Sequence, residues 1–218
     1  MKGADVIYEN EGILVLNKAA GFAVQGGERV SASLDQALET ELGAKVFLVH
    51  RLDKDTSGLI LVAKNRESAA FYAQLFSDRS LKKSYLAVAA GKIDTRQSFI
   101  TSPISVKGVQ KEALTHYQVL AQNKDYSVIE MDLGTGRMHQ LRIHLASLSH
   151  PILGDDKYGD FKLNKRLRKE RSLRRLLLHA RRLLLPSSPF APHLDLFAPV
   201  PEAFLPYLEE LGLSTALT

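Results

Sequence analysis

The polar segment from His50 to Gly58 holds the side chains of this sequence that are best suited to chemistry. Its Asp53 can serve as a nucleophile, a general base or a metal ligand. Arg51 stands two residues earlier, so an extended backbone would place a cation and a carboxylate on one face. An isolated Arg-x-Asp pair more often closes a loop as a structural ion pair, and a catalytic interpretation therefore needs support from other segments.

A second candidate segment is a glycine turn that leads into a helix rich in hydrogen-bond donors. It spans residues 134–144 and reads GTGRMHQLRIH. Leu141, Leu145 and Leu148 form an apolar stripe, which leaves Arg142 on another side, from which its guanidinium can reach a carboxylate. A solvated helix face is the simpler interpretation of the same pattern.

Other catalytic chemistries have little support in the sequence. The chain has no cysteine, which excludes thiolate nucleophiles, disulfides and cysteine-based zinc sites. His139, His144 and His150 lie near Asp155 and Asp156, but no H-E-x-x-H motif occurs, and we expect neither a metal nor a cofactor. A Ser-His-Asp hydrolase is disfavoured because there is no G-x-S-x-G motif.

Positive charge is concentrated in one region of a chain whose net charge is +5. Residues 162–182 contain ten Lys and Arg residues against Glu170 alone. Such a block favours binding to a polyanion, because each neutralised phosphate releases counterions. The alternative is a solvated, partly flexible loop.

Apolar patterning predicts the elements that position these segments. Strands are predicted at residues 6–8, 13–16, 46–49, 59–63, 84–89, 114–121, 126–133 and 176–178. Helices are predicted from residue 34 to 42, with Ser31 or Ser33 as N-cap, from Asn65 to about Ser80, after Gly136 as far as Pro151, and from Pro206 to Gly212. The Asp53 segment then forms a loop between two strands, a common place for a functional site.

The remaining features indicate one globular domain. The chain has 218 residues, is 45% hydrophobic, and has no repeat or linker-like tract, so we expect a single catalytic domain over residues 1–218. No apolar run approaches the roughly 18 residues of a membrane span, and residues 1–5 lack the apolar run of a secretory signal. We therefore expect a cytoplasmic protein, with a monomer as the default.

Three separated motifs together resemble the RluA family of pseudouridine synthases. They are residues 50–59, Lys83-Ser84-Tyr85, and residues 136–144 followed by 150–155 and 158–159. The resemblance extends from Val6 to Leu208 and is strongest to RluC-type ribosomal RNA enzymes. Those enzymes usually begin with an S4 RNA-binding domain, which we do not expect here. The implied fold is α+β, with a mixed, largely antiparallel sheet flanked by helices and a catalytic cleft between two halves.

The resemblance also implies roles for individual residues. Asp53 is the expected nucleophile, Arg51 helps to hold the extruded site open, Tyr85 lines the uracil pocket, and Arg142 pairs with the catalytic carboxylate. The implied substrate is a uridine in structured RNA, with ribosomal RNA expected before transfer RNA. The residues expected to contact RNA phosphates are Lys165, Arg166, Arg168, Lys169, Arg174 and Arg175.

Two alternatives remain open from the sequence. The chain could be a catalytically silent RNA-binding or assembly factor that uses the same basic residues, although intact Asp53, Tyr85 and Arg142 argue against it. A nucleoside glycosidase that releases the base would need a second carboxylate, for which Asp55 is the near candidate.

Overall fold

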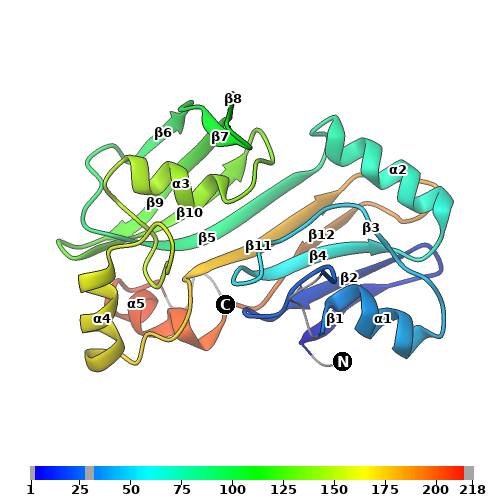
Figure 1. The fold of residues 1–218 in the computed structure, drawn as a ribbon, viewed down its shortest axis with the longest axis horizontal. Helices are drawn as coiled ribbons and strands as arrows, with labels where there is room; N and C mark the ends of the chain where they lie inside the picture. Colours follow the sequence, from blue (N-terminus) through cyan, green and yellow to red (C-terminus); the bar gives the residue numbers. More distant parts are fainter. Residues whose placement is uncertain (1–2, 28–31, 214–218) are drawn as a thin grey trace. The chain divides into compact units, whose positions relative to one another are not determined.

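The structure is a computed structural model that describes residues 3–27 and 32–213 (Figure 1). The chain forms two compact units. The first unit contains the residues up to Lys83 together with Ala180–Ala198, and the second unit contains Ser84–His179 together with the residues from Pro199 onward. Two strands, β5 and β11, each contribute residues to both units, because the chain passes from one unit to the other within them.

The first unit is built on antiparallel strands. The strand order is β1-β2-β4-β11, with β3 paired to β4 and β12 paired to β11. The six strands are β1 (Ala4–Glu9), β2 (Ile13–Lys18), β3 (Phe47–Leu48), β4 (Ser57–Ala63), β11 (Leu178–Leu185) and β12 (Leu194–Phe197). Every residue of β4 is buried, as its continuous apolar sequence predicts.

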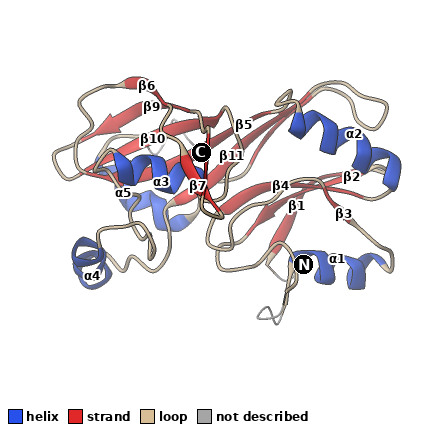
Figure 2. Ribbon diagram, turned by 45° about the horizontal axis from the view of Figure 1, so that its top comes forward, coloured by secondary structure: helices blue, strands red, loops and turns tan. Residues whose placement is uncertain are grey.

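Two helices belong to the first unit, α1 (Leu34–Leu42) and α2 (Arg66–Ser77), and Figure 2 shows them in blue beside the red strands. Asn65 is the N-cap of α2, since its side chain accepts a hydrogen bond from the Ser68 N–H. Tyr72 of α2 packs into a core made by alternating residues of the strands, which are Ile13, Val15, Leu59, Leu61, Leu183 and Leu185. Helix α2 therefore covers one face of these strands.

The second unit has a four-stranded antiparallel sheet in the order β5-β10-β9-β6. The strands are β5 (Lys82–Ala90), β6 (Gln97–Ile100), β9 (Thr115–Gln122) and β10 (Tyr126–Leu133), and a separate hairpin is formed by β7 (Ile104–Val106) and β8 (Val109–Lys111). Its helical elements are α3 (Gln140–Ser147), α4 (Phe161–Glu170), the 3-10 turn η1 (Glu202–Phe204) and α5 (Leu205–Glu210).

Most of the predicted elements are confirmed. The fold is α+β, with a largely antiparallel sheet flanked by helices, and the predicted hairpin is β9 and β10. Gly43 ends α1 in the left-handed conformation, with φ of 63°. Ser33 is the N-cap residue of α1 by position, but its hydroxyl bonds the Asp35 carboxylate instead of the helix backbone. Ser31, the other proposed cap, lies outside the described residues.

Two strand predictions are wrong in their extent. The strand predicted over residues 46–49 is reduced to Phe47–Leu48, because the side chain of His50 takes the next strand hydrogen bond from the Leu61 N–H. The strand predicted over residues 176–178 begins only at Leu178 and extends to Leu185. The single-domain assignment and the cleft between two halves stay predictions. Among the described residues, no helix is long and apolar enough to cross a membrane.

Candidate active site

The Asp53 segment is a tight turn that leads directly into β4. The Thr56 N–H donates a hydrogen bond of 3.1 Å to the Asp53 carbonyl oxygen. Leu52 and Thr56 are buried on either side, whereas Asp53 is partly exposed and Arg51 is exposed. The turn is therefore anchored in the first unit by its apolar and small residues, and it leaves the Arg51 and Asp53 side chains accessible.

Lys18, the last residue of β2, anchors this turn through a hydrogen bond to its backbone. Its side chain is fully buried, and the Nζ atom donates to the carbonyl oxygens of Ala19, Phe22 and Lys54 at 2.8, 2.9 and 2.9 Å. Burying an ammonium is costly unless its protons are hydrogen-bonded, and here three carbonyl groups supply that compensation. The buried Lys18 side chain is thus bonded to the backbone of Lys54, the residue that follows Asp53. The sequence analysis did not single out Lys18.

His50 forms a second anchor of the same turn. Its Nε2 atom accepts the Leu61 N–H at 2.9 Å, its Nδ1 atom lies 3.3 Å from Nζ of Lys83, and its ring stacks on Phe76 with 4.2 Å between centroids. Because Nε2 accepts a hydrogen bond, a neutral ring carries its proton on Nδ1. That proton points to Lys83, whose amine can accept it only when the lysine is uncharged.

The ionisation of both residues agrees with this arrangement. Burial lowers the pKa of Lys83 to about 7. Burial and the neighbouring Lys83 hold the pKa of His50 well below its ordinary value. The contact between these two residues links the Asp53 turn to β5.

Gly58 allows another strand to approach the end of the turn. Its φ is 109°, and a Cβ atom at this position would lie 2.2 Å from the carbonyl oxygen of Ala180 in β11. Only glycine accommodates both the conformation and the contact. The Thr-Ser-Gly end of the motif is thereby explained by packing within the first unit.

Arg142 lies in the second unit and forms a buried ion pair with Asp155. Its Nε and Nη2 atoms each donate to the Asp155 carboxylate at 2.7 Å, and Nη2 also reaches Asp156 at 3.3 Å. Arg142 and Asp155 are 3% and 0% exposed. The two parallel bonds fix the plane of the guanidinium, so Asp155 orients Arg142.

The Asp155 carboxylate is stabilised in its charged form. Burial alone would raise its pKa, but the bonds from Arg142 and from the backbone N–H groups of Tyr158 and Lys157 outweigh burial and lower the pKa. The sequence analysis considered Asp155 only as a possible metal ligand and as a member of a motif. Its position in a Gly-Asp-Asp turn just after the Arg142 helix was the available signal.

Helix α3 begins at Gln140, so His139 lies outside the helix that carries Arg142. His139 precedes the helix in a left-handed conformation, and its Nδ1 atom lies 3.0 Å from the Tyr158 hydroxyl. The Arg142 guanidinium lies 5.3 Å from the centre of the Tyr158 ring. Tyr158 therefore brings His139 and Arg142 to one location, although they do not share a helix face.

Gln140 and His144 hold the start of α3 against β9. The Gln140 amide is 2% exposed and bonds the Thr135 hydroxyl, the Arg137 N–H, the Leu114 carbonyl and the Thr115 hydroxyl. His144 is bonded by Thr115 and donates to the Ser102 carbonyl, and burial lowers its pKa. Gln140 and His144 of the second motif therefore hold backbone segments in place through hydrogen bonds.

The three histidines considered as metal ligands have separate protein partners. His139 contacts Tyr158, His144 contacts Thr115 and Ser102, and His150 donates to the Ala90 carbonyl. Within residues 3–27 and 32–213, no group of three or more His, Cys, Asp or Glu side chains gathers as metal ligands would.

Tyr85 lies on β5 of the second unit, opposite Met131 of β10, and is 6% exposed. Arg51 and Asp53 belong to the first unit, whereas Tyr85 and Arg142 belong to the second. The convergence of these four residues on one site stays a prediction.

The first part of the basic block, residues 162–170, is helical, which excludes a flexible loop for that part. Lys165, Arg166, Arg168 and Lys169 are exposed on α4, and Arg174 is exposed after it. Arg175 differs, because its guanidinium lies 5.9 Å from the Phe204 ring centre and its Nε donates to the Leu176 carbonyl. Arg166 lies 3.8 Å from Glu170.

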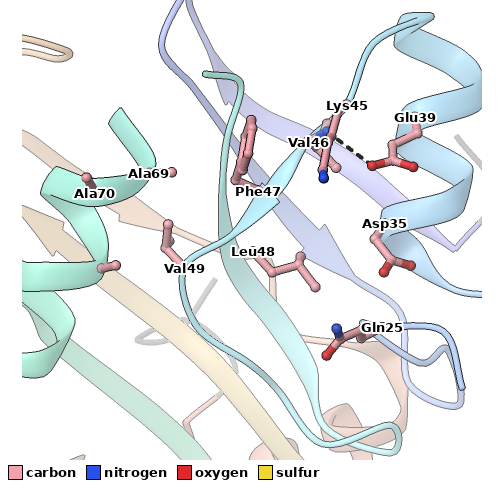
Figure 3. Close-up of a pocket in the computed structure, with 11 residues that line it drawn as sticks. Gln25, Asp35, Glu39, Lys45, Val46, Phe47, Leu48, Val49, Ala69 and Ala70 are labelled. Atoms are coloured by element: carbon pink, nitrogen blue, oxygen red, sulfur yellow. Dashed lines mark hydrogen bonds between the residues drawn. The ribbon is translucent and has the colours of Figure 1, made fainter. Parts of the chain in front are cut away.

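A separate cavity of about 510 Å³ lies in the first unit between α1, β3 and α2 (Figure 3). Its lining includes Asp35, Glu39, Lys45 and the apolar residues Phe47 and Val49, and Glu39 accepts a hydrogen bond from the Val46 N–H. None of the predicted catalytic residues lines it. Its two carboxylates disfavour a phosphate, so it is a poor site for RNA.

Comparison with known proteins shows which chains this sequence resembles. The chain is 37% identical over 214 residues to the ribosomal large subunit pseudouridine synthase C of Rickettsia bellii. The aligned region covers 91% of this chain and 69% of the relative. It is 36% identical to the tRNA pseudouridine synthase C of Haemophilus ducreyi, over 82% of this chain and 84% of the relative.

A solved structure has the same fold. Human RNA Pseudouridylate Synthase Domain Containing 4 matches with a TM-score of 0.79 and 28% identity, over 95% of this chain and 92% of that chain. The RNA pseudouridylate synthase family profile matches residues 12–147, which include the Asp53 turn, Tyr85 and Arg142. This chain therefore belongs to the RNA pseudouridylate synthase family, whose members isomerise uridine to pseudouridine in RNA.

Proposed function

We propose that this protein isomerises uridines of large-subunit ribosomal RNA and that Asp53 is its nucleophile. The observation that carries the proposal is the Asp53 turn, which Lys18 and His50 anchor while the carboxylate stays partly exposed. A nucleophile needs such fixed yet accessible placement. The similarity to the ribosomal enzymes of Rickettsia bellii and Rickettsia felis, at 37% and 38% identity, supports the substrate.

The reaction needs no redox step and no external energy. The N1–C1′ bond of the uridine breaks, the uracil turns while it remains bound, and a C5–C1′ bond forms. The C5 proton is released to water, and N1 gains a proton. Asp53 forms the covalent intermediate, either at C1′ of the sugar or at C6 of the uracil.

Arg51 and Tyr85 have supporting roles in this proposal. The target uridine must leave its stack before Asp53 can reach it, which costs a few kcal/mol. Arg51 is exposed two residues from Asp53 and is long enough to fill the vacated position. Tyr85, on a buried strand, presents its ring to the uracil.

Arg142 is proposed to pair with Asp53 in addition to its acidic partners in the second unit. Asp155 and Asp156 engage Nε and Nη2. A guanidinium carries five N–H donors, so one arginine can serve more than one carboxylate. Asp155 would thus serve as the positioning residue for a guanidinium that also contacts the catalytic carboxylate.

The basic residues of α4 complete the proposal. Lys165, Arg168 and Lys169 are exposed on a helix that is fixed at both ends, by the Asp160 cap and by the ion pair of Arg171 with Glu210. Contacts from such residues to RNA phosphates position a substrate without reading its sequence.

Transfer RNA is the second candidate substrate. The relative from Haemophilus ducreyi that is named a tRNA pseudouridine synthase is nearly as similar, and this chain covers more of its length than of the Rickettsia bellii relative. Both RNA classes require the same catalytic residues, so the two candidate functions differ only in which RNA is modified.

The test is tritium release from C5-labelled ribosomal RNA and transfer RNA taken from source cells that lack the gene. Release from ribosomal RNA alone is the expected result, and mapping of the modified position in the same RNA then identifies the uridine. Release from transfer RNA alone would replace the proposed substrate with the second candidate. Retained RNA binding without release from naked RNA or assembled subunits would favour a silent binding factor.

A further inference from the structure

Phe161, the first residue of α4, is exposed on a helix that carries five exposed lysines and arginines. Its exposed fraction is 62%, and among the described residues no ring or cation stacks on it. The other strongly exposed phenylalanines differ in this respect, since Phe99 contacts the His116 ring and Phe197 lies under Arg181 and Arg182. A single exposed apolar residue is ordinary in a soluble protein. Phe161 differs from such a residue because exposed lysines and arginines accompany it on the same helix.

Helical spacing places Phe161 among cations. At about 100° per residue, Phe161, Lys165 and Arg168 at positions i, i+4 and i+7 fall within an arc of roughly 60°. Lys162 and Lys169 both lie beyond one edge of this stripe, about 80–100° from Phe161, and all five side chains are exposed. The buried residues Asn164 and Leu167 lie about 60° and 120° from Phe161, on the side of the helix that faces the protein. Glu170, the acidic residue of α4, lies about 180° from Phe161 and is near Arg166.

The helix is a fixed platform. The Asp160 carboxylate accepts the N–H groups of Lys162 and Leu163 at 2.9 Å each. The Asn164 side chain accepts the Gly154 N–H and donates to the Asp155 carbonyl, both at 2.9 Å. Phe161 therefore stands on a helix tied to the residue that orients Arg142, and little ordering is needed when a ligand binds.

These features are the ones expected of a binding site for an unpaired nucleotide. A nucleobase offers a flat π-face for which an aromatic ring is the usual partner, and its flanking phosphates carry the charge that lysine and arginine attract. Lys165 lies about one helical turn, or roughly 5.4 Å along the axis, from Phe161. In a perfect duplex the bases are stacked on each other and their faces are not accessible to the ring.

We propose that Phe161 is a base-stacking position for an unpaired nucleotide of the RNA substrate, with Lys165 and Arg168 binding the adjacent phosphates. This inference rests on the proposed function only in taking RNA as the partner. It adds a second contact with a base, away from the uridine that is isomerised. It also separates the roles on α4, because the ring contributes affinity that does not depend on salt, whereas the cations contribute affinity that does.

The test compares the binding of Phe161→Leu, Phe161→Trp and wild-type protein to two RNA probes over a range of salt concentrations. One probe is a hairpin with 2-aminopurine in an unpaired loop, and the other is a perfect duplex of equal length. Phe99→Leu, which removes an equally exposed ring from β6, is the matched control. We expect Phe161→Leu to weaken hairpin binding about 5- to 150-fold without changing the salt slope. Phe161→Trp should retain binding and quench the 2-aminopurine fluorescence.

Three results would overturn the inference. They are wild-type affinity of Phe161→Leu for the hairpin, an equal loss on the duplex, and absence of hairpin binding by the wild-type protein. Tritium release keeps the two proposals apart. Wild-type release together with unchanged binding by Phe161→Leu contradicts only the stacking position, whereas selective loss of hairpin binding in a protein that releases no tritium contradicts only the proposed function.

Discussion

The Nδ1 atom of His50 lies 3.3 Å from the Nζ atom of Lys83, and burial lowers the pKa of this lysine to about 7. The pair joins the residue that opens the Asp53 motif to the lysine that opens the Tyr85 motif. Both residues come from segments that the sequence analysis singled out, but the analysis assigned neither of them a role.

The lowered pKa of Lys83 predicts how stability depends on pH. The pKa of Lys83 is about 7 in the folded protein and about 10.4 in an unfolded chain, so between these values the unfolded state binds more protons. The free energy of unfolding therefore rises with pH from about 7 upward, by at most about 1.4 kcal/mol per pH unit, and the cost of burying the lysine is complete below pH 7. Lys83→Met should flatten this rise. Urea unfolding at pH 7, 8 and 9 measures both slopes, and identical slopes would show that Lys83 is charged in the folded protein.

The ion pair of Arg142 with Asp155 predicts a large difference between two adjacent carboxylates. Asp155→Asn should lower the free energy of unfolding by about 3–5 kcal/mol, because it leaves a buried guanidinium without its bidentate partner. Asp156→Asn should cost less than about 1 kcal/mol, because the Asp156 side chain is 72% exposed. Urea unfolding of the two variants at one pH is the measurement. Equal losses would mean that the pair does not anchor Arg142.

The approach of β11 to Gly58 predicts an effect of backbone packing. Gly58→Ala should cost more than about 4 kcal/mol or prevent folding, since its Cβ would lie 2.2 Å from the Ala180 carbonyl oxygen. Gly43→Ala, where φ is also positive but nothing lies within 4 Å of the Cβ, should cost about 1–2 kcal/mol. Thermal unfolding of both variants distinguishes steric overlap from conformational strain. Similar melting temperatures would contradict the close approach.

The exposed cations of α4 predict a change in the salt dependence of RNA binding. Replacing Lys165, Arg168 and Lys169 with glutamine should reduce the slope of log affinity against log salt by about 2, as expected for three lost phosphate contacts on single-stranded RNA. Replacing Lys92, Lys111 and Lys124, which are also exposed in the second unit, is the control with the same change in charge. Equal slopes for the two triple variants would assign the effect to net charge alone.

The sequence predicted the core of the fold because its apolar patterns are strong there. The pairing of β9 with β10 and the capped helix α2 follow from alternation and from Asn65. Helix α4 was missed because only Leu163 and Leu167 mark its buried side, and the charge of the segment resembles that of a solvated loop. The Asp160 cap was its clearest signal. Short strands such as β7 and β8, of three residues each, give no pattern to recognise.

The motifs of the candidate site were predictable from the sequence, but the residues that hold those motifs in place were not. Asp53, Arg142 and Tyr85 stand in recognisable segments, whereas the partners that anchor the Asp53 turn are distant in sequence. Lys18 reaches the Lys54 carbonyl across 36 residues, and His50 reaches Lys83 across 33. No local pattern encodes such contacts, since they depend on how the strands are arranged in the folded chain.

The central claim, that Asp53 is the nucleophile, is tested most directly by single-turnover tritium release from C5-labelled ribosomal RNA. Asp53→Asn keeps the shape of the side chain and removes its charge, and Asp55→Asn makes the same change two residues later in the same loop. We predict no detectable release with Asp53→Asn, a rate near that of the wild type with Asp55→Asn, and RNA binding by both variants. Release by Asp53→Asn at the wild-type rate, or loss of release only in Asp55→Asn, would contradict the assignment.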